Sequence, residues 1–310
     1  MNNTVYIITG PTATGKSLIA YYLSKRVNGE IVNCDSIQLY KYMDIGSAKP
    51  VLDDMQRVPH HLYSVTTPDD TMTVARYREM ALSTINDILS RGKTPIVCGG
   101  TGLYLNSIIY DMQFGAGADD DSRRTELERI AKERGNLYMH QYLEALDPDA
   151  ASRIHPNNVR KVIRAIEAYE YGKGIGDISN IKLNQKYDFK FFALNMDRDW
   201  LYERINKRTL KLINDGLVRE VSELIAKGYS IDLPAMQGIG YKEIVCYLYG
   251  ECDLDTATEM IQKNTRHYAK RQITWLKRYI FTNWIKIEKG ESVGQIVDRI
   301  LDYKPEQQNG

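Results

Sequence analysis

Short apolar runs alternate with longer segments of helical periodicity in the N-terminal third of the chain. The runs TVYIIT (4–9), EIVNCDS (30–36) and TPIVCGG (94–100) are rich in β-branched residues and predict buried strands. Between them, 17–27 and 72–92 carry apolar residues at helical spacing. This alternation predicts a parallel sheet with helices on both of its faces.

A helical stretch then interrupts the alternation. A glycine-rich and acidic segment, 115–124, predicts a linker, and strand character returns only at 189–196. The segments between them with helical patterns are 123–135, 137–154 and 157–172. We therefore expect a catalytic core made of 1–118 and 191–310, with mostly helical C-terminal residues, and a helical insertion at 119–190.

The first strand leads into GPTATGKS, which matches the phosphate-loop pattern G-x-x-x-x-G-K-[ST]. In this pattern the backbone N–H groups and the N-terminus of the next helix surround an anion, the lysine adds a cation, and the hydroxyl can bind Mg²⁺. A strand precedes the motif and a helix follows it, so we expect a P-loop NTPase-like α/β fold. The candidate diphosphate-binding residues are Gly10, Pro11, Thr12, Ala13, Thr14, Gly15, Lys16 and Ser17, and Ser17 is the candidate Mg²⁺ ligand.

One expected part of a nucleotide-hydrolysing site is missing from the pattern. Such sites place an acid at the end of a hydrophobic strand to hold Mg²⁺, but the strand TPIVC ends in Gly99, Gly100 and Thr101. The second strand instead ends near Asp35, which a parallel sheet would bring to the same crevice. An aspartate that only caps a helix is the alternative reading. The missing acid indicates that phosphate is not the transferred group.

Seven motifs, in order from about residue 4 to residue 275, resemble the bacterial tRNA dimethylallyltransferase family. The phosphate loop alone is unspecific, whereas the ordered set is highly specific and spans nearly the whole chain. The motifs are GPTATGKS, DSIQLYKYMDIGSAKP, VPHHL, GGTGLY, RIHPNNVRKVIRAIE, MQGIGYKE and TRHYAKRQITW.

The resemblance implies transfer of a dimethylallyl group from dimethylallyl diphosphate to N6 of the adenosine just 3′ of the anticodon in tRNA. It implies that Asp35 is the general base, that Thr101 orients the amine, and that an arginine, for which Arg208 is the candidate, assists the diphosphate. It also implies contact between the insertion and the anticodon stem-loop. The implied tRNA contacts are Asp35, Ser36, Ile37, Gln38, Thr101, Arg123, Val159, Arg160, Lys161, Val162 and Ile163.

The most basic stretch of the chain is KNTRHYAKRQITWLKR, 263–278, which holds six lysines and arginines and no acid. Cations of this kind bind backbone phosphates, and the interleaved Tyr268 and Trp275 could stack on bases. The alternative is a solvated helix face with both aromatic residues in the core. The candidate phosphate contacts are Arg266, Lys270 and Arg271.

Composition limits the location and the partners of the protein. The net charge is +1, from 41 lysines and arginines against 40 acids, so any RNA-binding surface has to be local. The four cysteines form no C-x-x-C pair, which favours a reducing compartment and argues against a zinc site. With no leader pattern and no apolar run long enough to span a bilayer, we expect a cytoplasmic protein without membrane contact. We also expect a monomer.

Three other functions stay open at this point. An enzyme that prenylates free adenine nucleotides could use the same phosphate loop, but it would not need the insertion or the basic stretch. A small-molecule kinase of the P-loop group should turn over ATP alone. A nucleotide-dependent RNA-binding protein would not need Asp35 at the crevice.

Overall fold

The computed structural model describes residues 3–50, 52–112, 121–170 and 182–303. The chain forms two compact units, which we describe separately. The larger unit contains Met1–Ile109 and Asn184–Gly310, and the smaller unit is Tyr110–Leu183. The insertion predicted at 119–190 begins and ends later than the smaller unit, and most of the predicted linker lies outside the described residues.

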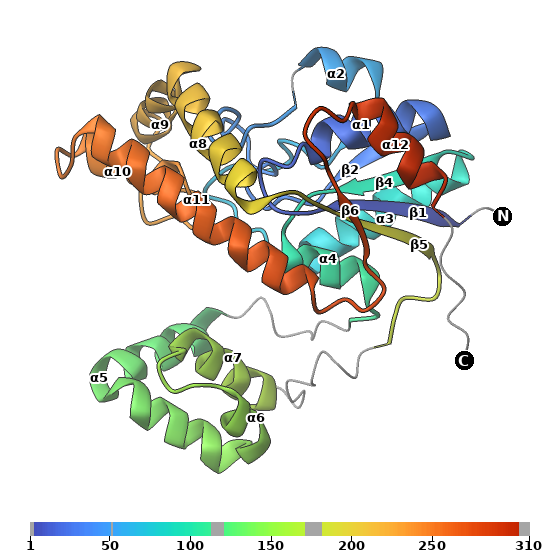
Figure 1. Cartoon of the computed structure of the whole chain (residues 1–310). Helices are drawn as coiled ribbons and strands as arrows, with labels where there is room; N and C mark the ends of the chain where they lie inside the picture. Colours follow the sequence, from blue (N-terminus) through green and yellow to red (C-terminus); the bar gives the residue numbers. More distant parts are fainter. Residues whose placement is uncertain (1–2, 51, 113–120, 171–181, 304–310) are drawn as a thin grey trace. The chain divides into compact units, whose positions relative to one another are not determined.

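The larger unit is built on a sheet of six parallel strands, which confirms the predicted fold class (Figure 1). The strand order is β3-β2-β4-β1-β5-β6. Two strands, β3 and β6, are too short to show a period in the sequence and were not predicted. The strands are β1 Thr4–Thr9, β2 Gly29–Asn33, β3 His60–His61, β4 Thr94–Cys98, β5 Asp188–Asn195 and β6 Asn283–Lys286.

Helices cover both faces of the sheet because successive strand residues point to opposite sides. On one face, Ile8 packs in a cluster with Ile19 of α1 (Lys16–Val27) and Ile296 of α12 (Val293–Leu301). The other face is covered by α3 (Val74–Ser90) and α4 (Gly102–Ile109), which pack against each other. This sandwich fixes the carboxyl ends of the strands, where ligands bind in open parallel sheets.

Further helices of the larger unit surround a second apolar cluster that includes Met43, Leu217 and Tyr241. Helices α8 and α11 lie side by side (Figure 1). The remaining helices of this unit are α2 Leu52–Arg57, α8 Arg198–Asn214, α9 Leu217–Ala226, α10 Tyr241–Leu248 and α11 Leu254–Leu276.

The smaller unit consists of α5 (Asp121–Leu146), α6 (Pro148–Arg153) and α7 (Val159–Glu170). Gly135, with φ 83°, interrupts α5, at the point between the two helices that the sequence predicts. The unit has its own apolar core, made of residues that include Leu127, Met139, Leu143, Val162 and Ile166. None of the helices in the described parts of either unit combines the length and the apolar character that crossing a bilayer requires.

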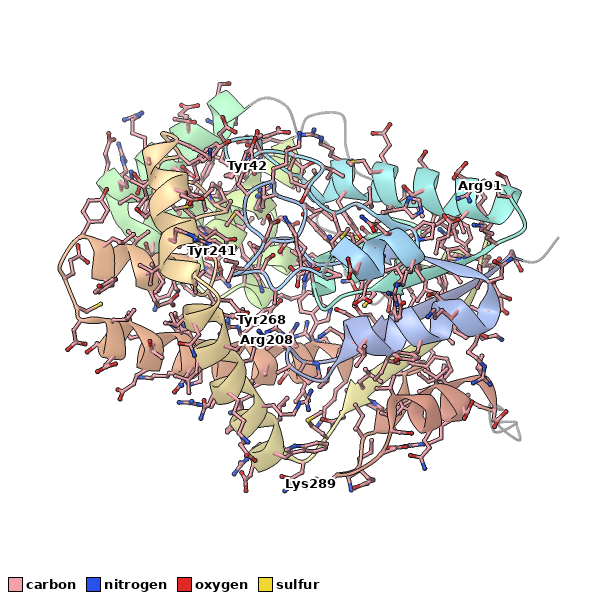
Figure 2. All side chains as sticks on the ribbon, turned by 90° about the horizontal axis from the view of Figure 1, so that it is seen from above. Tyr42, Arg91, Arg208, Tyr241, Tyr268 and Lys289 are labelled. Atoms are coloured by element: carbon pink, nitrogen blue, oxygen red, sulfur yellow. The ribbon has the colours of Figure 1, made fainter. Side chains whose placement is uncertain are left out.

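Charged residues also stabilise the amino end of the sheet. The Glu30 carboxylate is buried and pairs with Arg91 at 2.6 Å, Lys93 at 2.7 Å and His61 at 2.7 Å. These partners hold the pKa of Glu30 well below its usual range, the hydrogen bond from Arg91 being the largest cause. Figure 2 shows Arg91 far from Arg208 and Tyr268, so this cluster is separate from the crevice described next.

Candidate active site

The phosphate loop connects β1 to α1 in a conformation that depends on glycine. Gly10 has φ 138°, and a Cβ atom there would lie 2.5 Å from the carbonyl oxygen of Leu194. Gly15, with φ 92°, precedes the first turn of α1. The first amide groups of a helix have no partner within it, and they carry the positive end of the helix dipole. The loop is therefore suited to bind an anion.

Three cations adjoin this loop. The Lys16 Nζ donates a hydrogen bond to the Pro11 carbonyl oxygen at 2.9 Å, and burial lowers its pKa to about 8, with Arg208 acting in the same direction. From α8, Arg204 Nε donates to the Ala13 carbonyl oxygen at 2.8 Å. Arg208 Nη1 lies 3.4 Å from Thr12 Oγ1, and burial lowers its pKa while Asp35 opposes the shift. The cluster can stabilise several negative charges at once.

Asp35 follows β2 and is held by its neighbours. The Asn33 side-chain oxygen accepts the Asp35 N–H at 2.9 Å, and one Asp35 carboxylate oxygen accepts the Ile37 N–H at 3.0 Å. The next N–H, that of Ser36, donates to Thr101 Oγ1 at 3.1 Å. This last bond joins the turn after β2 to the turn after β4, so Asp35 and Thr101 lie in one part of the crevice.

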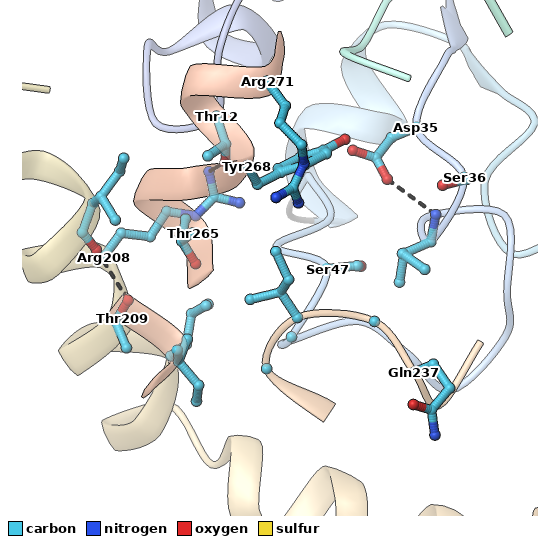
Figure 3. Close-up of a pocket in the computed structure, with 18 residues that line it drawn as sticks. Thr12, Asp35, Ser36, Ser47, Arg208, Thr209, Gln237, Thr265, Tyr268 and Arg271 are labelled. Atoms are coloured by element: carbon cyan, nitrogen blue, oxygen red, sulfur yellow. Dashed lines mark hydrogen bonds between the residues drawn. The ribbon is translucent and has the colours of Figure 1, made fainter. Parts of the chain in front are cut away.

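The phosphate loop and the Asp35 turn open onto one pocket of about 300 Å³. Figure 3 shows the Arg208 and Arg271 side chains pointing into this space, with Asp35 beside Tyr268. Burial, and then the Asp35 carboxylate, raise the pKa of Tyr268, so its hydroxyl stays protonated at neutral pH. The apolar residues of the wall are Ile37, Ile205, Leu212, Ile239 and Ile261. The pocket thus combines cations, one carboxylate and an apolar surface.

A loop after β2 contributes Gly46 and Ser47 to the pocket wall. The Glu220 carboxylate of α9 holds this loop by accepting the N–H groups of Asp44 at 2.8 Å, Ile45 at 2.6 Å and Gly46 at 2.9 Å. Tyr241 donates its hydroxyl to the same carboxylate at 2.8 Å. The loop is fixed by a buried anion rather than by regular secondary structure.

Comparison with known proteins identifies the family. Residues 38–279 match the family described as IPP transferase. The chain is 46% identical to a tRNA dimethylallyltransferase of Alkaliphilus oremlandii, with 98% of each chain covered, and 44% identical to that of Clostridioides difficile, with 96% covered. The chain belongs to the IPP transferase family.

Solved structures agree with this assignment. The tRNA isopentenylpyrophosphate transferase of Bacillus halodurans is 36% identical, has a TM-score of 0.71, and covers 97% of this chain and 96% of its own. A eukaryotic dimethylallyltransferase acting on tRNA is 28% identical with a TM-score of 0.78, over 91% of this chain and 74% of its own.

In this IPP transferase the donors for a metal ion are few. The Ser17 side chain is exposed at the start of α1, and its hydroxyl hydrogen-bonds the Cys98 thiol at the end of β4. Burial raises the pKa of Cys98 to about 11, so the thiol is neutral. The described residues contain no group of three metal-ligating side chains. A hydroxyl combined with diphosphate oxygens and water is an oxygen set that suits Mg²⁺, so the residues fit a metal that arrives with its substrate.

Some predicted tRNA contacts have a structural role in the larger unit. Gln38 is buried, and its Nε2 donates to the Ser47 carbonyl oxygen at 3.0 Å, so it anchors the loop. Arg266 donates to Asn206 at 2.7 Å. Lys270 and Arg271 are both exposed on α11, and Arg271 also lines the pocket. Of the three cations predicted to bind phosphates, Lys270 and Arg271 are exposed and have no side-chain hydrogen bond or ion pair among the described contacts, but Arg271 lies over the Tyr268 ring and lines the pocket.

The aromatic residues of the basic stretch face inward. Tyr268 lines the pocket. Trp275 packs against Gly102, where a Cβ atom would lie 2.5 Å from the indole ring, and its Nε1 donates to the Tyr279 hydroxyl at 2.9 Å. Tyr268 therefore faces the pocket and Trp275 packs against the turn after β4, and stacking of RNA bases on the two rings stays a prediction. Both rings are partly buried, while the lysines and arginines at 263, 270, 271, 277 and 278 are exposed.

In the smaller unit, some of the predicted tRNA contacts are buried and others are exposed. Val162 and Ile163 are buried in its core, so their side chains cannot reach RNA from there, whereas Arg160 and Lys161 are exposed. Arg123 is paired with Glu126 and Glu170 and contacts Tyr142. Contacts of Val159, Arg160, Lys161 and Arg123 with tRNA stay predictions.

Two features of the site were missed by sequence reasoning. Gln272 of α11 hydrogen-bonds both the phosphate loop and the turn after β4. Glu220 holds the loop at Gly46 from a position 174 residues away. Gln272 lies in the motif TRHYAKRQITW, where the surrounding basic residues give no sign that a neutral side chain bridges two loops.

Proposed function

We propose that this chain transfers a dimethylallyl group from dimethylallyl diphosphate to N6 of the adenosine immediately 3′ of the anticodon in tRNA, and releases diphosphate. The observation that carries the proposal is one pocket that joins Thr12 of the phosphate loop, the cations Arg208 and Arg271, the Asp35 carboxylate and an apolar wall. The membership of the IPP transferase family supports it.

The cations act on the leaving group. As the bond between C1 of the donor and the diphosphate oxygen breaks, negative charge grows on the diphosphate. Lys16, Arg208 and the amides at the start of α1 are arranged to stabilise that charge. Mg²⁺ held with Ser17 would neutralise diphosphate charge when bound. The apolar wall would exclude water from the donor carbon.

The carboxylate acts on the nucleophile. The N6 amine is weak because its lone pair is delocalised into the base, and it has to lose a proton as the N6–C1 bond forms. Asp35 accepts that proton, and the Thr101 hydroxyl, which is fixed by the Ser36 N–H, orients the amine. In this reaction the C1–O bond of the donor breaks, the N6–C1 bond forms, the N6 proton moves to Asp35 and diphosphate leaves.

Recognition of tRNA needs local cations because the net charge of the chain is +1. Exposed lysines of α11, among them Lys263 and Lys270, and the exposed Arg160 and Lys161 of α7 are available for phosphate contacts in the anticodon stem-loop. The two groups belong to different units of the chain.

One incubation tests the proposal. Unmodified tRNA, the protein, Mg²⁺ and dimethylallyl diphosphate are combined, and the nucleosides are analysed by mass spectrometry. We expect N6-dimethylallyladenosine at the single adenosine next to the anticodon. Parallel reactions contain AMP, ADP or ATP in place of tRNA. Modification of the free nucleotide alone would favour the nucleotide-prenylating alternative, and rapid turnover of ATP without tRNA would favour a kinase.

A further inference from the structure

One buried side chain connects the two segments that hold the two substrates. Gln272 of α11 is 6% exposed. Its Oε1 accepts the N–H of Thr12, in the phosphate loop, at 2.8 Å. Its Nε2 donates to the carbonyl oxygen of Gly100, in the turn after β4, at 3.1 Å. A single amide thus bridges loops that are far apart in the sequence.

The bridge is tightly enclosed. A Cβ atom at Gly100 would lie 2.2 Å from Gln272 Nε2, so the turn has no room for a larger residue beside the amide. Ala269 and Leu276, about one helical turn away on either side, are buried and hold this face of α11 against the unit. The side chain therefore has little freedom to reach other partners.

We propose that Gln272 is a positioning residue that sets the distance between the donor carbon and the acceptor amine. This inference rests on the proposed function. The Thr12 segment carries the leaving group, and the Gly100 segment continues into Thr101, which orients the nucleophile. Both polar atoms of the Gln272 side chain are engaged by the backbone of these two loops, so in this role it acts through the loops.

This role predicts a specific kinetic effect. Each loop keeps the groups that bind its own substrate when the bridge is lost, so the KM values should change by less than about threefold even if the two loops shift relative to each other. A displacement of about 1 Å between reacting groups can cost roughly 10²-fold in rate. We therefore expect kcat to fall about 10- to 10²-fold.

Two variants test the bridge. Gln272→Met keeps the length of the side chain and removes both hydrogen bonds, and Gln272→Glu keeps the acceptor for Thr12 but cannot donate to Gly100 when ionised. Gln262→Met, the same change elsewhere on α11, is the matched control and should resemble the wild type. Steady-state kinetics with tRNA and dimethylallyl diphosphate, together with thermal melting, give the readout.

The outcomes separate the possibilities. A lower kcat at similar KM values in a folded variant supports the inference, while an unchanged kcat, or a rise in donor KM alone, overturns it. Lack of activity in the wild type would instead refute the proposed function. If both variants unfold, hydrogen exchange of the Thr12 amide in the wild-type protein decides. Slow exchange supports the bridge, and exchange as fast as in an open loop overturns it.

Discussion

Replacement of Asp35 by asparagine tests the chemistry most directly. The asparagine oxygen can still accept the Ile37 N–H, which Asp35 accepts at 3.0 Å, so the turn should persist. The amide cannot take a proton, and loss of a general base costs about 10²–10⁴ in rate. That range corresponds to about 2.7–5.5 kcal/mol of transition-state stabilisation.

A second effect of the substitution is smaller. The Asp35 carboxylate raises the pKa of Lys16, which burial lowers to about 8, so Asp35→Asn lowers that pKa further. Even if only about half of Lys16 then stayed protonated at pH 7, donor binding would fall by about twofold. A factor of that size cannot explain a loss of about 10²-fold, so the two causes can be separated by magnitude.

The assay is single-turnover transfer at saturating tRNA and donor, with tRNA binding measured by fluorescence anisotropy. Asp232→Asn, which changes an exposed carboxylate that does not line the pocket, is the matched control. We expect near-normal tRNA affinity in both variants and a slow rate only in Asp35→Asn. A rate within a few fold of wild type would remove Asp35 from the proton transfer.

Three further predictions follow from the cations and the anchored loop. Because Lys16 is charged below its pKa of about 8 and neutral above it, diphosphate affinity measured by calorimetry should fall as pH rises through that value in the wild type, and less so in Lys16→Ala. Replacing exposed Lys270 and Lys277 by alanine should reduce the slope of log affinity for tRNA against log salt by about 0.7–0.9 per lost contact, and an unchanged slope would exclude this face of α11. Glu220→Ala leaves three N–H groups without their acceptor, so the free energy of unfolding should fall by about 1–3 kcal/mol in denaturant titrations, whereas no loss would show that the loop at Gly46 is held by other contacts.

Sequence reasoning was most successful where a local pattern determines the structure. The strand Thr4–Thr9 and the helix Lys16–Val27 follow from a β-branched run, a glycine loop and helical periodicity, all within a few residues of one another. The strands His60–His61 and Asn283–Lys286 have too few residues for a period to be recognised. They exist because neighbouring strands offer them backbone partners.

The site shows the same division between local and distant causes. The phosphate loop and Asp35 could be predicted from motifs and strand ends. The bridging role of Gln272 could not be predicted, because its partner Thr12 lies 260 residues away in the sequence. The burial of Val162 and Ile163 could have been predicted, since apolar residues recur at helical spacing along α7. Their prediction as tRNA contacts rested on the family resemblance, whereas the spacing of apolar residues places them on the core face of α7.

The distribution of charge in the pocket explains why this fold suits prenyl transfer rather than nucleotide hydrolysis. Beside the phosphate loop, β4 ends in Cys98, and burial keeps that thiol neutral by raising its pKa to about 11. The part of the site that would bind the diphosphate therefore has the cations Lys16 and Arg208, and β4 adds no carboxylate to it. Among the described residues that line the pocket, Asp35 has the only carboxylate, and it follows β2, the strand beyond β4. Strand β4 lies between Asp35 and the phosphate loop. At that position Asp35 can accept a proton from an incoming amine without facing the leaving group.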